Sequence, residues 1–147
     1  MGQLHPVSNR EQVVDTMIGL TRLSNLHRVI VAGSGSMELY LALRQRGFIR
    51  VATTATCRTP RAQHAIGLIT GQNAPAAIEA ALARISPFLG ASAAIAILVE
   101  TRESGVCLKI RSRLEQMGFR IEAGVRCRQG LVLSAYRQGF VQMESAA

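Results

Sequence analysis

One segment near the N-terminus constrains the fold more than any other part of the chain. Residues Val29 to Ala32 form a short, entirely apolar run, as expected of a strand covered on both faces. Gly33 and Gly35 end this run, apolar residues then recur at helical spacing over residues 36–47, and Phe48–Thr54 is rich in strand-forming residues. A strand, turn, helix and strand in this order predict two parallel strands joined by a right-handed crossover.

The rest of the chain extends this α/β unit. The pattern predicts helices at residues 10–24, 75–88 and 103–117 and strands at 65–69, 93–99, 119–126 and 131–136. The last two strands are separated by only a short turn, so they must form an antiparallel hairpin. We therefore expect one domain over residues 1–147, with a tail from 138 to 147. Its fold class is a three-layer, Rossmann-like α/β sandwich with a mostly parallel sheet ending in an antiparallel hairpin.

Composition excludes several classes of protein. The chain is 48% hydrophobic and 18% charged, which argues against a disordered protein. No apolar run reaches the ~20 residues that span a bilayer, and the first residues lack the apolar core of a signal peptide. Three widely spaced cysteines, Cys57, Cys107 and Cys127, argue for a reducing compartment and against a disulfide framework or a zinc site. We expect a bacterial-style cytoplasmic protein without a membrane partner.

The chain is strongly basic. The formal net charge is +8, and Lys109 is the one lysine among the 17 basic residues. An excess of arginine suggests a polyanionic partner such as nucleic acid. The arginines are spread along the chain, however, as in a solvated surface or a GC-rich coding bias, and no nucleic-acid-binding motif is present.

Three stretches carry a family resemblance: VIVAGSGSM, GFIRVATT and LEQMGFRIEAGVRCRQGLVLSAYR. Together with the order of elements, they resemble the class I S-adenosylmethionine-dependent methyltransferases over about residues 10 to 137. In that family a glycine-rich turn and the end of the second strand hold the cofactor. The resemblance therefore implies a cofactor-binding site made of the following residues: Gly33, Ser34, Gly35, Ser36, Thr53, Thr54 and Gly71. We also expect Ser36 to cap the helix after the turn, and the turn to open on the largest cleft.

The chain departs from the family where the family uses acids. Val31 stands at the usual acid of the glycine motif, and Thr53 and Thr54 stand at the acid that binds the ribose. The segment between Thr54 and Ala65 is too short for the helix, strand and helix that the family has there. S-adenosylmethionine carries an ammonium and a sulfonium, so a site without carboxylates loses charge-assisted hydrogen bonds. We expect weak or absent binding of this cofactor.

The sequence leaves ligands other than S-adenosylmethionine as alternatives. The glycine turn before a helix N-terminus favours an anion, so a small anionic or nucleotide-like ligand is possible. Thr53, Arg58 and Arg61 could hold the 2′-phosphate of NADP, although Glu38 stands where a dinucleotide motif needs its third glycine.

Catalytic candidates are few. No pair of carboxylates converges by spacing, so we predict no catalytic residue. Glu38 and Glu100 are the two acids that could approach the cofactor, and Glu100 ends the predicted central strand, where open α/β sheets bind ligands. Glu100 could equally cap the next helix or pair with Arg102. Cys57 follows the second strand near the expected mouth of the site, as either a reactive thiol or an ordinary loop residue.

Three functions follow from these features. The first is a non-catalytic binding or interaction module with a degenerate cofactor cleft. The second is an active S-adenosylmethionine-dependent methyltransferase with a divergent site. The third is an NADP-binding, phosphate-binding or nucleic-acid-binding Rossmann-like protein.

The second strand also bears on assembly. With no third strand beside it, Phe48–Thr54 should form a sheet edge that has one charge, Arg50, and no proline. Such an edge is poorly protected and tends to pair with a second copy across a two-fold axis. We therefore expect a homodimer, unless the N-terminal helix or the tail from Gln138 covers the edge.

Overall fold

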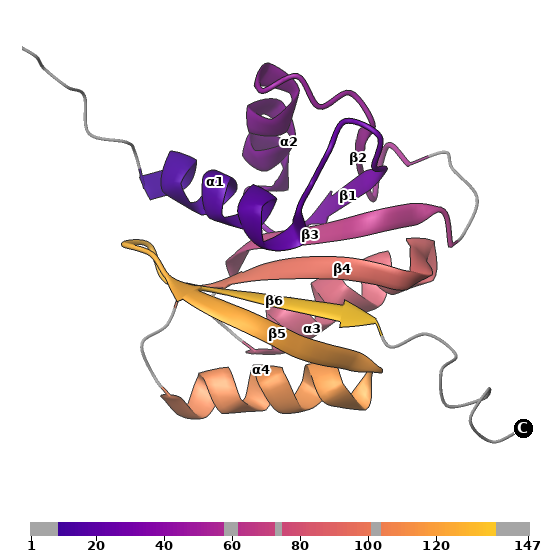
Figure 1. The fold of residues 1–147 in the computed structure, drawn as a ribbon. Helices are drawn as coiled ribbons and strands as arrows, with labels where there is room; N and C mark the ends of the chain where they lie inside the picture. The colour runs from indigo at the N-terminus through magenta and orange to yellow at the C-terminus, as the bar shows by residue number, and fades with distance from the viewer. Residues whose placement is uncertain (1–8, 58–61, 73–74, 101–103, 138–147) are drawn as a thin grey trace, which may run out of the picture.

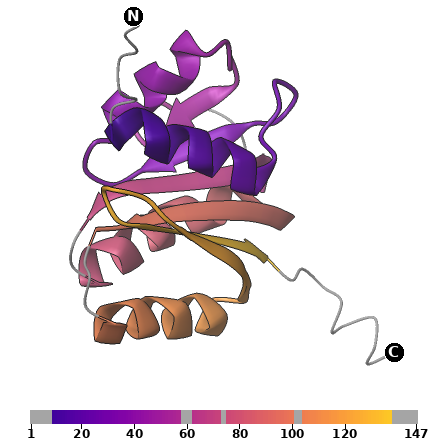
Figure 2. The same ribbon diagram turned by 60° about the vertical axis from the view of Figure 1, so that its left-hand side comes forward.

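The computed structural model describes residues 9–57, 62–72, 75–100 and 104–137. They form a six-stranded sheet with the strand order β2-β1-β3-β4-β6-β5 and helices on both faces (Figures 1 and 2). The elements are α1 (Asn9–Thr21), β1 (Val29–Ala32), α2 (Ser36–Gln45), β2 (Val51–Thr53), β3 (His64–Gln72), α3 (Pro75–Ile85), the 3₁₀ turn η1 (Ser86–Phe88), β4 (Leu89–Val99), α4 (Ser104–Gln116), β5 (Phe119–Arg126) and β6 (Leu131–Arg137). The predicted fold class is confirmed.

Strand direction follows the prediction as well. β1 pairs in parallel with both β2 and β3, and β3 pairs in parallel with β4. β6 lies between β4 and β5 and is antiparallel to both, so the sheet ends in the predicted hairpin. β4, the most apolar segment, occupies a central position.

Two apolar cores lie on opposite faces of the sheet. On one face, α1 and α2 bury Val13, Met17, Leu39 and Leu43 against β1, β3 and β4. On the other face, α3 and α4 bury the following side chains: Ile78, Leu82, Ile85, Ile110 and Leu114. Figure 2 shows these helices as two layers with the sheet between them. These positions match the apolar spacing of each helix, which explains why helices and strands alternate as predicted.

Several element boundaries differ from the prediction. The strand expected at Phe48–Thr54 is only Val51–Thr53, because the Phe48 N–H donates to the Leu43 carbonyl, 3.1 Å away, and closes the end of α2. The predicted cap by Ser36 is wrong: Gly35 occupies the N-cap with φ 79°, without any side-chain cap, and Ser36 begins the helix. β3 and β4 start earlier than predicted, at His64 and Leu89.

β2 forms one edge of the sheet, as expected. α1 does not cover that edge, because it packs over β4 and β6, so one of the two alternatives to a homodimer is wrong. The tail from Gln138 lies outside the described residues. Among the described helices, none combines the length and the apolar character needed to cross a membrane.

Candidate ligand-binding site

The turn after β1 is held against the end of β3. Gly33 has φ 98°, and a Cβ at this position would lie 2.2 Å from the Thr70 carbonyl oxygen. The Thr70 hydroxyl donates to the Ser34 carbonyl at 3.2 Å. Only glycine accommodates both this backbone conformation and this close approach. The glycine motif therefore has a structural cause that is visible in the fold.

The turn opens on a cleft of about 310 Å³, at the low end of the range for small-molecule sites. The cleft lies at the carboxyl edge of the parallel strands, where open α/β sheets bind ligands. Its lining residues come from α1, the glycine turn, α2, β3, β4 and the β5–β6 turn: Arg10, Val13, Val14, Ser34, Gly35, Glu38, Leu39, Thr70, Leu98, Glu100 and Gln129. The glycine turn therefore borders a cleft, as expected.

The cleft is not the largest one, contrary to the prediction. A hollow of about 460 Å³ lies between α1 and α2, and another of about 530 Å³ lies between α3 and α4. Both hollows are lined only by residues of the helices and by Arg46, the C-cap of α2, so they do not reach the ends of the strands. The smaller cleft combines polar groups from six different segments and is the better site.

One wall of the cleft is α1, which sequence reasoning did not place there. The Arg128 N–H donates to the Gln12 side-chain oxygen at 3.1 Å, and Thr16 Oγ1 lies 3.4 Å from Cys127 Sγ. These contacts fix α1 to the turn of the C-terminal hairpin. The apolar stripe of α1 predicted a buried face, but no local signal shows which strands it covers.

Two carboxylates reach the cleft. Glu38 lies in the first turn of α2 and pairs with Arg10 at 3.7 Å, with both side chains largely exposed. Glu100 follows β4, and its Oε1 accepts a hydrogen bond from Gln129 Nε2 at 2.6 Å. The structure thus brings together the two acids singled out in the sequence. The alternative pairing of Glu100 with Arg102 involves a residue outside the described ones.

The predicted site residues separate into two groups. Ser34 and Gly35 line the cleft, Gly33 shapes the turn, and Ser36 starts α2. Thr53 and Thr54, at the end of β2 and in the turn after it, do not line the cleft and form the second group. Gly71 follows Thr70 in β3, and Thr70 is part of the lining.

The polar groups of Thr53 form hydrogen bonds within its own turn. Its side chain is buried, its hydroxyl lies 3.0 Å from the Thr56 hydroxyl, and its N–H donates to Thr56 Oγ1 at 3.0 Å. Val31, at the other acid position of the family, is fully buried in the α1–α2 core. Neither position therefore provides the carboxylate that the family resemblance places there for cofactor binding.

Cys57 is not at the mouth of this cleft, contrary to the prediction. Its Sγ lies 3.9 Å from Nε2 of His64, which starts β3, and neither residue lines the cleft. His64 is 2% exposed and packs edge-on against Phe88. Burial lowers the pKa of the His64 imidazole, and the charge of Arg28 acts in the same direction. Arg58, the neighbour of Cys57 in the sequence, lies outside the described residues.

The described residues contain no group of three His, Cys, Asp or Glu side chains that could hold a metal ion. The Arg58 and Arg61 pocket expected for NADP also lies outside the part of the chain that the structure describes. The site is therefore defined by the cleft at the glycine turn.

Comparison with known proteins decides the fold family. A protein-(glutamine-N5) methyltransferase from Alicyclobacillus acidocaldarius superposes with a TM-score of 0.53 at 17% identity, covering 93% of this chain and 99% of the other. A precorrin-6y C5,15-methyltransferase from Geobacter metallireducens gives a TM-score of 0.61 at 14% identity, covering 92% and 94%. The chain has the class I methyltransferase fold.

A third structure with this methyltransferase fold is a putative tRNA (m1A22) methyltransferase from Streptococcus pneumoniae, solved with S-adenosyl-L-methionine. It has a TM-score of 0.55 at 14% identity and covers 91% of this chain and 74% of its own. No protein-family model and no curated protein matches the sequence. The resemblance inferred from the glycine motif and the hairpin is thus confirmed as a likeness of fold.

Proposed function

We propose that this chain is a small-molecule binding module that keeps the cleft of the methyltransferase fold and has lost part of its cofactor site. The observation that carries the proposal is the uneven lining of the cleft. Glu38 and Glu100 are present, whereas the ends of β1 and β2 supply Val31 and Thr53 in place of acids. One part of a cofactor site is charged, and the other has no carboxylate.

The charged part favours a cation over an anion. Glu38 already places a negative charge in the first turn of α2, where the helix dipole would otherwise attract an anionic ligand. Of the ligand types expected from the sequence, a nucleoside with a cationic group therefore fits best. S-adenosylmethionine, with its ammonium and sulfonium, belongs to this class.

The other part of the site weakens that same ligand. The two ribose hydroxyls have no carboxylate acceptor, because Thr53 is buried and bonded to Thr56. Each charge-assisted hydrogen bond contributes about 1.5–3 kcal/mol, so two missing bonds reduce affinity by about 100-fold or more. We expect dissociation constants well above the micromolar range.

Isothermal titration with S-adenosylmethionine, its demethylated product and NADP tests the proposal. We expect weak binding, tighter for S-adenosylmethionine than for its demethylated product, which lacks the sulfonium charge, and loss of this preference in Glu38→Gln/Glu100→Gln. Glu115→Gln is the matched control, since Glu115 is exposed on α4 on the opposite face. A micromolar affinity, or tighter binding of NADP, contradicts the proposal.

An active methyltransferase is the second candidate, and the two carboxylates in the cleft are the observation that favours it. Conversion of methyl-labelled S-adenosylmethionine to its demethylated product, measured with a cell extract as the source of acceptors, separates the two. Turnover that disappears in Glu100→Gln establishes the enzyme. No turnover above a blank without protein supports the module.

We also propose that the module forms a homodimer through the β2 edge. Leu26 and Ile49 are 79% and 66% exposed beside this edge. Arg50 connects them, because it follows Ile49 and its Nη1 donates to the Leu26 carbonyl at 3.4 Å. Light scattering should give twice the chain mass of 15.8 kDa, and Ile49→Glu should restore the single-chain mass. A mass of one chain at every concentration contradicts the dimer.

A further inference from the structure

A basic surface lies at the end of the sheet opposite the cleft. We define this basic face by three exposed side chains, Arg22, Arg120 and Tyr136. The register of the sheet places it, because β6 starts beside Val99 at the cleft end and reaches Tyr136 beside Ala94. The basic face is therefore separate from the site discussed above.

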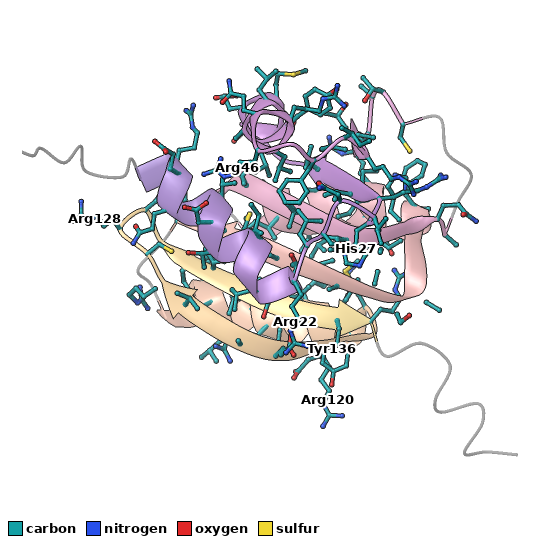
Figure 3. The ribbon with its side chains drawn as sticks, turned by 45° about the horizontal axis from the view of Figure 1, so that its top comes forward. Arg22, His27, Arg46, Arg120, Arg128 and Tyr136 are labelled. Carbon is teal, nitrogen blue, oxygen red and sulfur yellow. The ribbon has the colours of Figure 1, made fainter. Side chains whose placement is uncertain are left out.

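The side chains of the basic face come from three segments. Arg120 and Tyr136 are direct partners across β5 and β6, and α1 packs on β6. In Figure 3, Arg22 at the end of α1 lies next to Tyr136, with Arg120 beyond it. Tyr136 is 37% exposed. An aromatic ring thus lies between two guanidinium groups that are distant in the sequence.

The backbone at Arg22 is unusual. Arg22 has φ 55°, in the left-handed region that residues with a Cβ rarely adopt. This conformation follows the last turn of α1 and directs the chain into the loop that leads to Arg28. Glycine or asparagine normally occupies such a position, so the arginine is not explained by the turn itself.

Opposing charge is scarce around the basic face. The sequence has no acid between Asp15 and Glu38, so the loop that holds Arg22 contains no carboxylate. Within the described residues, Arg22 and Arg120 make no ion pair, whereas Arg10, Arg46 and Arg113 do. The acid closest along β5 is Glu122, which is exposed at a bulge. Positive charge is therefore left for a partner.

We propose that the basic face binds single-stranded nucleic acid, with phosphates on Arg22 and Arg120 and an unpaired base stacked on Tyr136. Separate cations around one aromatic ring match the spaced phosphates and exposed bases of a single strand. A duplex keeps its bases stacked on one another and would not use the ring. A membrane surface would require a larger apolar area than one tyrosine offers.

Fluorescence anisotropy with a fluorescein-labelled oligouridine of about 12 nucleotides tests this proposal on the full chain. We expect Arg22→Gln/Arg120→Gln to weaken binding and to reduce the salt dependence by about 0.7 in log–log slope for each arginine that no longer neutralises a phosphate. Tyr136→Ala should weaken binding roughly tenfold, and Tyr136→Phe should restore it.

Arg84→Gln/Arg111→Gln is the matched control, because it removes the same charge from exposed positions on α3 and α4. It should leave the affinity within about twofold, because every arginine that holds a phosphate is still present. Equal reductions of affinity in both double variants, or no effect of Tyr136→Ala, would overturn the proposal. Tighter binding of a duplex of equal length, or of phosphatidylserine vesicles, would do the same. Thermal unfolding of each variant shows whether the fold is retained.

Discussion

The two flanks of the sheet differ in the number and the length of their strands. On one side of β3 lie β4, β6 and β5, with 11, 7 and 8 residues, paired along their length apart from one bulge in β5. On the other side β1 is followed only by the three-residue β2. The long flank supplies Glu100 and Gln129 to the cleft, whereas the short flank has Thr53 and Thr54 where the family resemblance places an acid. The polar groups of the cleft thus come mainly from the side of the sheet with the longer strands.

The largest expected effect is on stability in the long flank. Leu133 is 1% exposed and packs in the core under α3 and α4, so Leu133→Ala should lower the free energy of unfolding by about 3 kcal/mol. Val51→Ala in β2 should cost about half as much, because it removes two methyl groups at the margin of the core. Urea unfolding measures both. Equal reductions would show that the short flank is as well packed as the long one.

A smaller effect is expected at the glycine turn. Gly33→Ala should destabilise the protein by about 2–3 kcal/mol, since it adds a close contact with the Thr70 carbonyl to the strain of φ 98°. Gly47→Ala is the control, because Gly47 has φ 93° and no atom near the added methyl group. It should cost only the conformational strain, about 1 kcal/mol. Thermal melting of the two variants isolates the contribution of the close approach to Thr70.

A carboxylate introduced into the short flank should change the affinity for S-adenosylmethionine. Thr54 is half-buried and does not line the cleft, but it stands where the family resemblance places the ribose-binding acid, so Thr54→Asp should strengthen S-adenosylmethionine binding by up to about tenfold. Thr53→Asp should instead destabilise the protein, because it buries a carboxylate where a hydroxyl now bonds Thr56. Titration calorimetry shows whether the first substitution helps. No gain in affinity would mean that the short flank lies too far from the ligand.

The smallest effect concerns pH. Burial holds the pKa of His64 below its usual value, so as the pH falls the unfolded chain takes up a proton before the folded protein does. Stability should therefore be full above about pH 6.5 and should decline below it. Urea unfolding at several pH values, compared between the wild type and His64→Phe, measures this decline. An unchanged decline in His64→Phe would assign it to other groups.

Sequence patterns predicted the elements that depend on local physics. The apolar runs of β1 and of residues 93–99 in β4, the glycine at position 47 just after α2 and the short turn before Leu131 each predict a strand, a helix end or a hairpin without reference to distant residues. Boundaries were harder. Phe48 has a strong strand propensity, yet its N–H completes the end of α2, because a hydrogen bond to Leu43 outweighs propensity at that point.

Only part of the candidate site could be predicted from the sequence. Gly33, Ser34 and Gly35 follow from a strand that ends in glycines, and Glu100 follows from its place after the central strand. The wall made by α1 depends on contacts with Cys127 and Arg128, more than a hundred residues away. Such contacts have no local signature. The family resemblance also suggested that Thr53 faces a ligand, whereas its hydroxyl is used within its own turn.

The insertion of β6 between β4 and β5 imposes an order on synthesis. β5 leaves the ribosome before β6 but has no place in the sheet until β6 pairs with β4. Until then the apolar edge of β4 has no partner, and α1, which is made earlier, lacks the hairpin turn that anchors it. Unpaired apolar strands of this kind are prone to aggregation during folding. The nascent chain is therefore expected to depend on chaperones until β6 emerges.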